Sequence, residues 1–252
     1  MSGHSKWASI KHKKAVVDSR RGAQFSKLTR AITVAAREGG GDPAANATLE
    51  NAVRKAREAS MPKDTIERAI AKGTGEGGEA DAIEAVIYEG YGSGGVALLI
   101  EAITDNRNRT GADVRHAFSK FGGSMGEPGS VAYLFAKKGT IVIDATRYSE
   151  DELMVAVDAG AEDVAIDEDV FEVICEQADF AAVRMALEQA GVEMESAELT
   201  YRPSMLAAID ESHAARLMRL IEALEDLDDV GAVHANFDVP SEVLERVASS
   251  AA

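Results

Sequence analysis

The residues best suited to chemistry lie near the N-terminus, where cations surround a single aromatic side chain. The run Lys6-Trp7-Ala8-Ser9-Ile10-Lys11-His12-Lys13-Lys14 contains the only tryptophan of the chain. Lysine and arginine neutralise phosphates and release counterions, which gives affinity for any nucleic acid and a steep dependence on salt. Trp7 would stack on a base or, equally, cap a small hydrophobic core. The candidate nucleic-acid contacts are Lys6, Trp7, Lys11, His12, Lys13, Lys14, Arg20, Arg21, Lys27 and Arg30.

The charge of the chain is divided unevenly along its length. The 252 residues carry a net charge of −16, yet residues 1–75 hold 15 basic and 7 acidic residues, a net of +8. The remaining residues hold 12 basic and 36 acidic side chains, a net of −24. A basic segment binds polyanions, and an acidic body would repel the same polymer and orient the encounter. The alternative is that the two parts neutralise each other within one molecule.

A second pair of cations, Arg107 and Arg109, lies between a predicted strand and a predicted helix that begins near Thr110 as its N-cap. A helix N-terminus already favours anions, so two arginines there predict that an anion or an acidic side chain joins them. We therefore consider Arg107 and Arg109 a candidate secondary anion site for a nucleic-acid phosphate. The alternative is that they pair with Asp105 or with acidic residues of the domain that we expect to be inserted at residues 136–203.

No arrangement of residues predicts catalysis. The segments Gly73–Gly78 and Gly90–Gly95 match G-x-G-x-x-G, but the first follows a helix and the second joins two strands, so neither opens a dinucleotide site. Cys175 lies in a strand pattern and is expected to pack in a core. The histidines lack metal-ligand spacing with one another or with Cys175. We expect no enzyme, no metal and no cofactor.

The hydrophobic periodicity predicts an α+β protein of three domains. A period of 3.6 through Phe25, Leu28 and Ile32, a helix starting at Asp42-Pro43, and a short third helix predict a three-helix domain in residues 1–75. Residues 136–203 read as βαββαβ, the ferredoxin-like order. The ββαβ segment of residues 80–135 lacks a final helix and strand, which residues 204–240 supply. Residues 136–203 are thus expected to be an acidic domain inserted in a split α/β domain.

The compartment is also suggested by composition. The N-terminus has no apolar run behind it, and the longest apolar stretch, residues 96–100, is far shorter than the ~20 residues that span a bilayer. A single cysteine cannot form an internal disulfide. We expect a soluble cytoplasmic protein without a membrane partner.

Several motifs together resemble the YebC/PmpR family. They are Ser2-Gly3-His4-Ser5-Lys6-Trp7, Ile10-Lys11-His12-Lys13-Lys14, Asp18, Arg21-Gly22, Phe25, Tyr88-Glu89-Gly90-Tyr91, Thr104-Asp105-Asn106-Arg107-Asn108-Arg109-Thr110, Gly122-Gly123-Ser124-Met125 and Pro128-Gly129-Ser130-Val131. The resemblance implies a three-domain cytoplasmic protein with a helical N-terminal domain that regulates transcription by binding promoter DNA. It also implies kinship with a mitochondrial translational activator of a cytochrome oxidase subunit and with ribosome-associated elongation factors.

The resulting hypothesis is a non-enzymatic DNA-binding transcriptional regulator that contacts phosphates through its basic N-terminal domain. The first alternative is a translation factor that docks on ribosomal RNA through the same surface and assists elongation. The second is an adaptor whose acidic domains bind another protein. No helix-turn-helix or RNP motif is present, so the sequence does not indicate how bases would be read.

Overall fold

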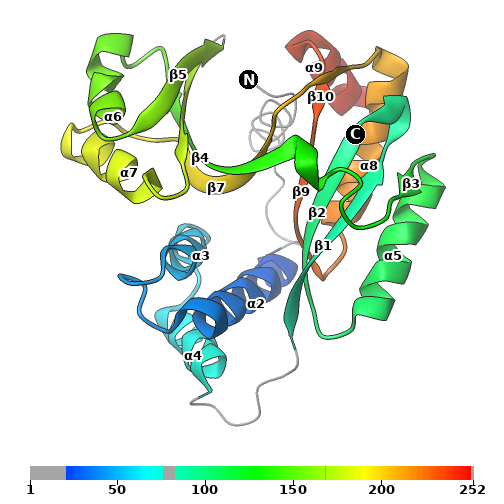
Figure 1. Ribbon diagram of the computed structural model, residues 1–252, viewed down its shortest axis with the longest axis horizontal. Coiled ribbons are helices and arrows are strands. Elements are labelled where there is room, and N and C mark those ends of the chain that lie inside the picture. The colour runs from blue at the N-terminus through cyan, green and yellow to red at the C-terminus, as the bar shows by residue number, and fades with distance from the viewer. Residues whose placement is uncertain (1–20, 76–82, 168, 251–252) are drawn as a thin grey trace.

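The chain folds as an α+β protein with a helical N-terminal unit, as the sequence predicts. The computed structural model describes residues 21–75, 83–167 and 169–250, and Figure 1 shows the helical unit beside two units that contain sheets. No described helix combines the length and the apolar character that crossing a membrane requires.

The helical unit contains α2 (Arg21–Gly39), α3 (Ala47–Glu58) and α4 (Lys63–Thr74). Their shared core includes the buried side chains of Ile32, Leu49 and Ile66, which recur at helical spacing. The prediction that the second helix starts at Asp42 is wrong. Asp42 caps a turn by accepting from the N–H of Ala44, and Asn46 caps α3 by accepting from the N–H of Leu49. Asparagine is as strong an N-cap as aspartate, so local sequence does not separate the two.

The first sheet belongs to the split unit and has the strand order β3-β1-β2-β9. Its strands are β1 (Glu84–Tyr91), β2 (Ala97–Thr104), β3 (Ser124–Met125) and β9 (Val230–Ala235). Three helices accompany it, namely α5 (Arg107–Lys120), α8 (Glu211–Glu225) and α9 (Ser241–Ser250), of which the sequence analysis missed α9. The short elements are η1 (Ser93–Gly95), η2 (Ala132–Leu134), and the paired strands β8 (Ala207–Ala208) and β10 (Phe237–Asp238).

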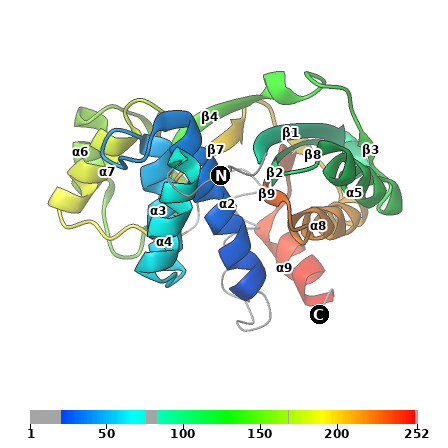
Figure 2. The same cartoon turned by 90° about the horizontal axis from the view of Figure 1, so that it is seen from below.

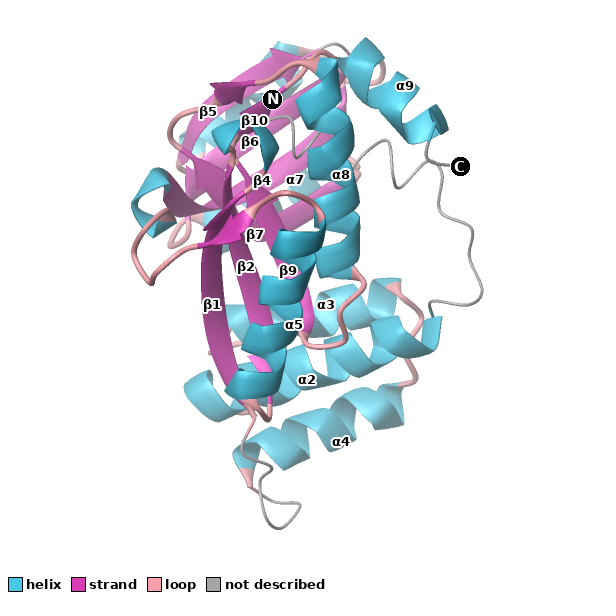
Figure 3. Ribbon diagram, turned by 90° about the vertical axis from the view of Figure 1, so that its right-hand side faces the viewer, coloured by secondary structure: helices cyan, strands magenta, loops and turns pink. Residues whose placement is uncertain are grey.

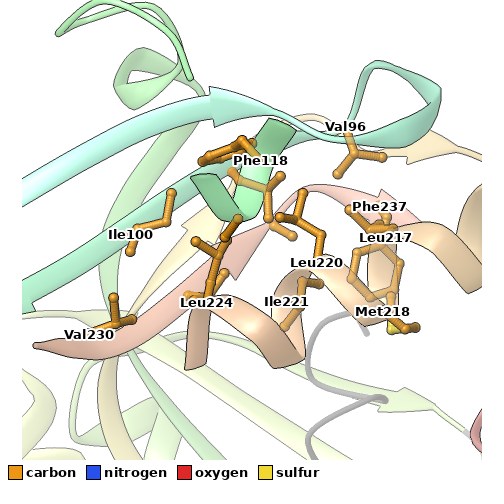
Figure 4. Close-up of a cluster of buried hydrophobic side chains, with 14 of the residues drawn as sticks. Val96, Ile100, Phe118, Leu217, Met218, Leu220, Ile221, Leu224, Val230 and Phe237 are labelled. Atoms are coloured by element: carbon orange, nitrogen blue, oxygen red, sulfur yellow. The ribbon is translucent and has the colours of Figure 1, made fainter. Parts of the chain in front are cut away.

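The central strand β2 is buried on both faces, which explains its continuous apolar run. Leu98 and Ile100 lie in the core formed with α5 and α8, which Figure 4 shows around Phe118, Leu217 and Leu220. Leu99, which points to the opposite face, packs in a second cluster that contains Phe135.

The inserted unit has the predicted ferredoxin-like fold. Its elements are β4 (Phe135–Asp144), η3 (Glu150–Leu153), α6 (Met154–Asp158), β5 (Ala161–Asp167), β6 (Val170–Glu176), α7 (Phe180–Gln189) and β7 (Ser196–Pro203). The strands pair in the order β5-β6-β4-β7, and all neighbouring strands are antiparallel. Ile141, Val173 and Leu187 belong to its core.

The two α/β units are joined by a pair of chain segments that lie side by side. Phe135 at the start of β4 pairs with Pro203 at the end of β7, and the N–H of Ser204 donates to the carbonyl of Leu134. Residues 132–134 form η2, and β4 begins directly after it at Phe135. The domain boundaries 80–135 plus 204–240 and 136–203 stay a prediction.

Candidate nucleic-acid interface

Most of the predicted contacts precede the described chain. Lys6, Trp7, Lys11, His12, Lys13, Lys14 and Arg20 lie outside the described residues, and Arg21 is the first residue of α2. The structure therefore places two of the predicted side chains in a described environment, Lys27 and Arg30, both on α2.

Lys27 contacts the C-terminal end of α8. Its Nζ donates to the carbonyl oxygen of Glu225 at 2.5 Å, where α8 leaves its last carbonyl groups without helical partners. Burial lowers the pKa of Lys27, although the nearby charges of Asp226 and Asp228 act in the opposite direction. Lys27 thus binds an acidic turn of its own chain.

Arg30 contacts the same turn, which connects α8 to β9. Its Nη1 donates to the carbonyl of Asp228 at 2.9 Å and to Oδ1 of Asp229 at 2.7 Å. Oδ2 of Asp229 also accepts from Nη2 of Arg109 and from Oγ1 of Thr110, each at 2.7 Å. The Asp229 side chain is only 8% exposed, so its charge is compensated almost entirely by these protein donors.

The environment of Asp229 lowers the pKa of its carboxyl group. Burial acts to raise the pKa of Asp229, but the hydrogen bonds from Arg109 and Thr110 and the charges of Arg109 and Arg30 outweigh that effect, and the pKa lies below its ordinary value. The carboxylate therefore stays ionised and holds Arg30 of the helical unit against Arg109 of the split unit. For Lys27 and Arg30, this arrangement is the neutralisation within one molecule that is the alternative explanation of the charge asymmetry.

The pair Arg107 and Arg109 lies in the first turn of α5. Asn106, rather than Thr110, caps this helix by accepting from the N–H of Arg109, so the predicted N-cap is wrong. Arg109 pairs with Asp105 at 2.8 Å as well as with Asp229, and Nε of Arg107 lies 3.5 Å from Glu84. The predicted pairing with Asp105 is therefore present. The other partners belong to the split unit and not to the inserted one.

These groups line a cleft of about 950 Å³ between the helical unit and the split unit. Its charged lining includes three cations and five carboxylates: Arg30, Lys72, Arg109, Asp105, Asp113, Asp226, Asp228 and Asp229. A free phosphate entering this cleft would meet more carboxylates than cations, which opposes its binding there. An anion role for Arg107 and Arg109 stays a prediction.

A second cavity of about 460 Å³ lies where the three units meet. Glu101, Lys55 and Tyr201 line it. His234 is not one of the lining residues, but its Nε2 lies 2.7 Å from Oε1 of Glu101. The charged lining is balanced, with four cations and four carboxylates: Lys27, Arg30, Lys55, Lys137, Glu38, Glu101, Asp228 and Asp229. This cavity therefore offers no preference for an anion.

Other cations of the helical unit face solvent. Arg57, Lys63 and Arg68 are exposed on α3 and α4, and none of them was predicted as a site residue. Among the described residues, Lys63 pairs with Glu67 and Arg68 donates to Asp64 and Thr65, all within α4. The signal that could have found Arg68 is its position on the side of α4 away from the buried residues Ile66 and Ala69.

The described residues contain no cluster of three His, Cys, Asp or Glu side chains that could hold a metal ion. Cys175 is fully buried in the core of the inserted unit, as predicted, and burial raises the pKa of its thiol to about 11. A thiol with such a pKa is a poor nucleophile at neutral pH.

Comparison with known proteins gives matches along nearly the whole chain. Residues 5–76 match the TACO1/YebC protein N-terminal domain, and residues 83–237 match the TACO1/YebC second and third domain. A protein of Rubrobacter xylanophilus named "probable transcriptional regulatory protein" is 55% identical over 98% of this chain and 100% of its own length. A Thermobifida fusca protein of the same name is 53% identical over the same shares. The crystal structure of a conserved hypothetical protein from Aquifex aeolicus superimposes with a TM-score of 0.79 at 47% identity, covering 89% of this chain and 93% of the other.

Proposed function

The chain belongs to the TACO1/YebC family, and from this premise we propose that it is a non-enzymatic transcriptional regulator that binds DNA through its basic N-terminal domain. The observation that carries the proposal is the segregation of charge, +8 in residues 1–75 against −24 in the rest. The names of its relatives support transcriptional regulation as the process. Phosphate contacts alone would not distinguish this role from other functions that involve nucleic acid.

The contacts of α2 refine which cations take part. Lys27 and Arg30 are engaged with the turn between α8 and β9, so we assign them the role of fixing the helical unit on the body. The cluster from Lys6 to Lys14, together with Arg20 and Arg21, is left as the phosphate-binding segment. Arg57, Lys63 and Arg68 extend the same positive unit toward solvent. The acidic body then limits how a polyanion approaches.

The test is a salt titration of binding, followed by fluorescence anisotropy with a short labelled DNA duplex of mixed sequence. Neutralising about five phosphates gives a slope of log K against log salt near −4 to −5. The variant Lys13→Gln/Lys14→Gln should make that slope shallower by about 2, since each phosphate contact contributes about 0.9. The matched control, Arg147→Gln/Arg246→Gln, removes two exposed cations that already pair with Glu193 and Glu211, and it should leave the slope unchanged.

A wild-type slope near zero would disprove phosphate binding. The choice between DNA and ribosomal RNA is decided separately, by sequencing the nucleic acid that crosslinks to the protein in cells. Reads that map to ribosomal RNA, with tighter binding of an RNA hairpin than of the duplex, would replace the transcriptional proposal with the translation-factor alternative.

A further inference from the structure

The arginines of the acidic body divide into two groups. Residues 83–250 contain nine arginines. Six of them form ion pairs with carboxylates: Arg107, Arg109, Arg147, Arg184, Arg202 and Arg246. The remaining three, Arg115, Arg216 and Arg219, are exposed and form no ion pair or hydrogen bond with any described residue. All three lie on α5 and α8.

These two helices form one surface. α5 and α8 pack side by side on the same face of the first sheet, where Phe118 of α5 and Leu217 and Leu220 of α8 share the buried core (Figures 3 and 4). Lys120, the last residue of α5, is also exposed, and its Nζ lies over the ring of Phe121, 5.3 Å from the centroid. We call Arg115, Lys120, Arg216 and Arg219 the α5/α8 cations.

The position of these cations is costly within an isolated chain. Arg216 and Arg219 are three residues apart on one exposed helix face, where their like charges repel each other. Glu222 lies three residues after Arg219, but the two side chains form no ion pair. Glu211, the acid of the first turn of α8, is taken by Arg246 of α9 at 2.8 Å. An external anion would relieve the repulsion.

The α5/α8 surface differs from the two cavities in its charge. The cleft beside α2 carries more carboxylates than cations, and the cavity between the three units is balanced. On α5 and α8, by contrast, four exposed cations lack a carboxylate partner among the described residues, whereas only two carboxylates of these helices, Asp113 and Glu222, form no ion pair there, so positive charge is in excess. Arg216 and Arg219 are separated by a rise of about 4.5 Å, and packed helix axes lie about 8–10 Å apart. Phosphates repeat along a strand at about 3.4 Å of helix axis, so several of them can lie over this surface.

We infer that the α5/α8 cations form a second contact surface for a nucleic-acid backbone. This inference rests on the proposed function, because it supposes that the polymer held by the N-terminal segment is long enough to reach the split unit. Guanidinium groups bind phosphate oxygens in a bidentate manner, and the interaction is not specific for base sequence. The surface would therefore add affinity and fix the orientation of the polymer on the body.

The test uses the full chain, a fluorescein-labelled DNA duplex and an RNA hairpin of equal length, and the same salt titration. We expect Arg216→Gln/Arg219→Gln to make the slope of log K against log salt shallower by about 2, and Arg216→Glu/Arg219→Glu to weaken binding further. The control Arg147→Gln/Arg246→Gln carries the same change of net charge at sites that are already paired. Circular dichroism on heating checks that each variant is folded, which the exposure of both arginines favours.

The outcomes separate the two proposals. If Lys13→Gln/Lys14→Gln changes the slope while Arg216→Gln/Arg219→Gln behaves like the control on both probes, the second surface does not exist and the proposed function stands. If the wild-type chain shows no salt dependence, the proposed function fails and the inference fails with it. If the α5/α8 cations serve an acidic protein instead, both probes will give the wild-type slope, which also overturns the inference.

Discussion

Arg30 and Asp229 form one of the ion pairs that join the helical unit to the rest of the protein, with Nη1 of Arg30 2.7 Å from Oδ1 of Asp229. The two residues are 199 positions apart in sequence. Because Arg109 and Thr110 donate to the other oxygen of the same carboxylate, Asp229 connects α2, α5 and the start of β9 at one point. The helical unit is thus held by a largely buried charge and not by apolar packing alone.

The variant Asp229→Asn should destabilise the chain by about 1–3 kcal/mol, because it removes a buried charge that accepts from two arginines. The pKa of Asp229 is lower in the folded chain than its ordinary value, so the stabilisation is complete at neutral pH and declines as the pH falls through the folded pKa. Urea unfolding at neutral and at acidic pH measures this difference. The control is Asp113→Asn, which changes an exposed residue of the same cleft. An equal loss of stability in both variants would contradict the stabilising role of the Asp229 carboxylate.

A second prediction concerns Glu89, a buried carboxylate on β1. Oε1 accepts from the N–H of Gly129 at 2.6 Å, and Oε2 accepts from the N–H groups of Val131 and Ala132 at 2.7 Å. Burial acts to raise the pKa of Glu89, but these three hydrogen bonds outweigh it and lower the pKa. The Glu89 side chain is therefore ionised, and in this form it holds the segment that leads into the inserted unit.

Glu89→Gln replaces one accepting oxygen by an amide that donates, so it should cost about 2 kcal/mol of unfolding free energy. Hydrogen exchange should accelerate at the amides of Gly129, Val131 and Ala132 and stay unchanged in the helical unit. Glu84→Gln, on the exposed end of the same strand, serves as the matched variant. Unaltered protection of the three amides would show that Glu89 does not hold the segment.

A third prediction concerns the contact between α2 and α4. A Cβ on Gly73 would lie 2.4 Å from the carbonyl oxygen of Thr33 and 2.7 Å from Cβ of Ala36, so Gly73→Ala should push the two helices apart at a cost of about 1–3 kcal/mol. Gly22 lies on the exposed start of α2 with open space around it, and Gly22→Ala should be neutral or stabilising by up to about 1 kcal/mol. Thermal unfolding compares the two variants, and equal melting temperatures would refute the close approach.

The sequence predicted the fold well where the determinants are local. The ferredoxin-like order of the inserted unit follows from alternating periods, and the buried residues of α7, Phe180, Val183 and Leu187, recur at helical spacing. The first residue of a helix was harder to predict, because two neighbouring residues can both serve as N-cap. Asp42 and Asn46 compete in this way before α3, and Asn106 and Thr110 compete at the start of α5. The choice between them is made by tertiary structure, as Asn46 shows by also donating to the carbonyls of Ala35 and Gly40.

The candidate site was harder to predict for the same reason. Lys27 and Arg30 lie on the polar side of an amphipathic helix, which is consistent with a solvent-facing cation. Their actual partners are near Glu225 and Asp229, about two hundred residues away, and no local pattern encodes a contact of that range. The three arginines without ion pairs on α5 and α8 could not be recognised either, because only the structure separates them from the six that are paired.

Phe135 and Pro203 pair where the chain enters and leaves the inserted unit, so the two ends of this unit lie together. Strands that pair lie about 5 Å apart, so the chain leaves the split unit and re-enters it at almost the same place. A tight turn of two residues would close that gap and leave the sheet of β1, β2 and β9 with its helices uninterrupted. The sheet of the split unit therefore does not need residues 136–203 to connect its strands, and replacing those residues by such a turn tests whether the split unit folds without the inserted one.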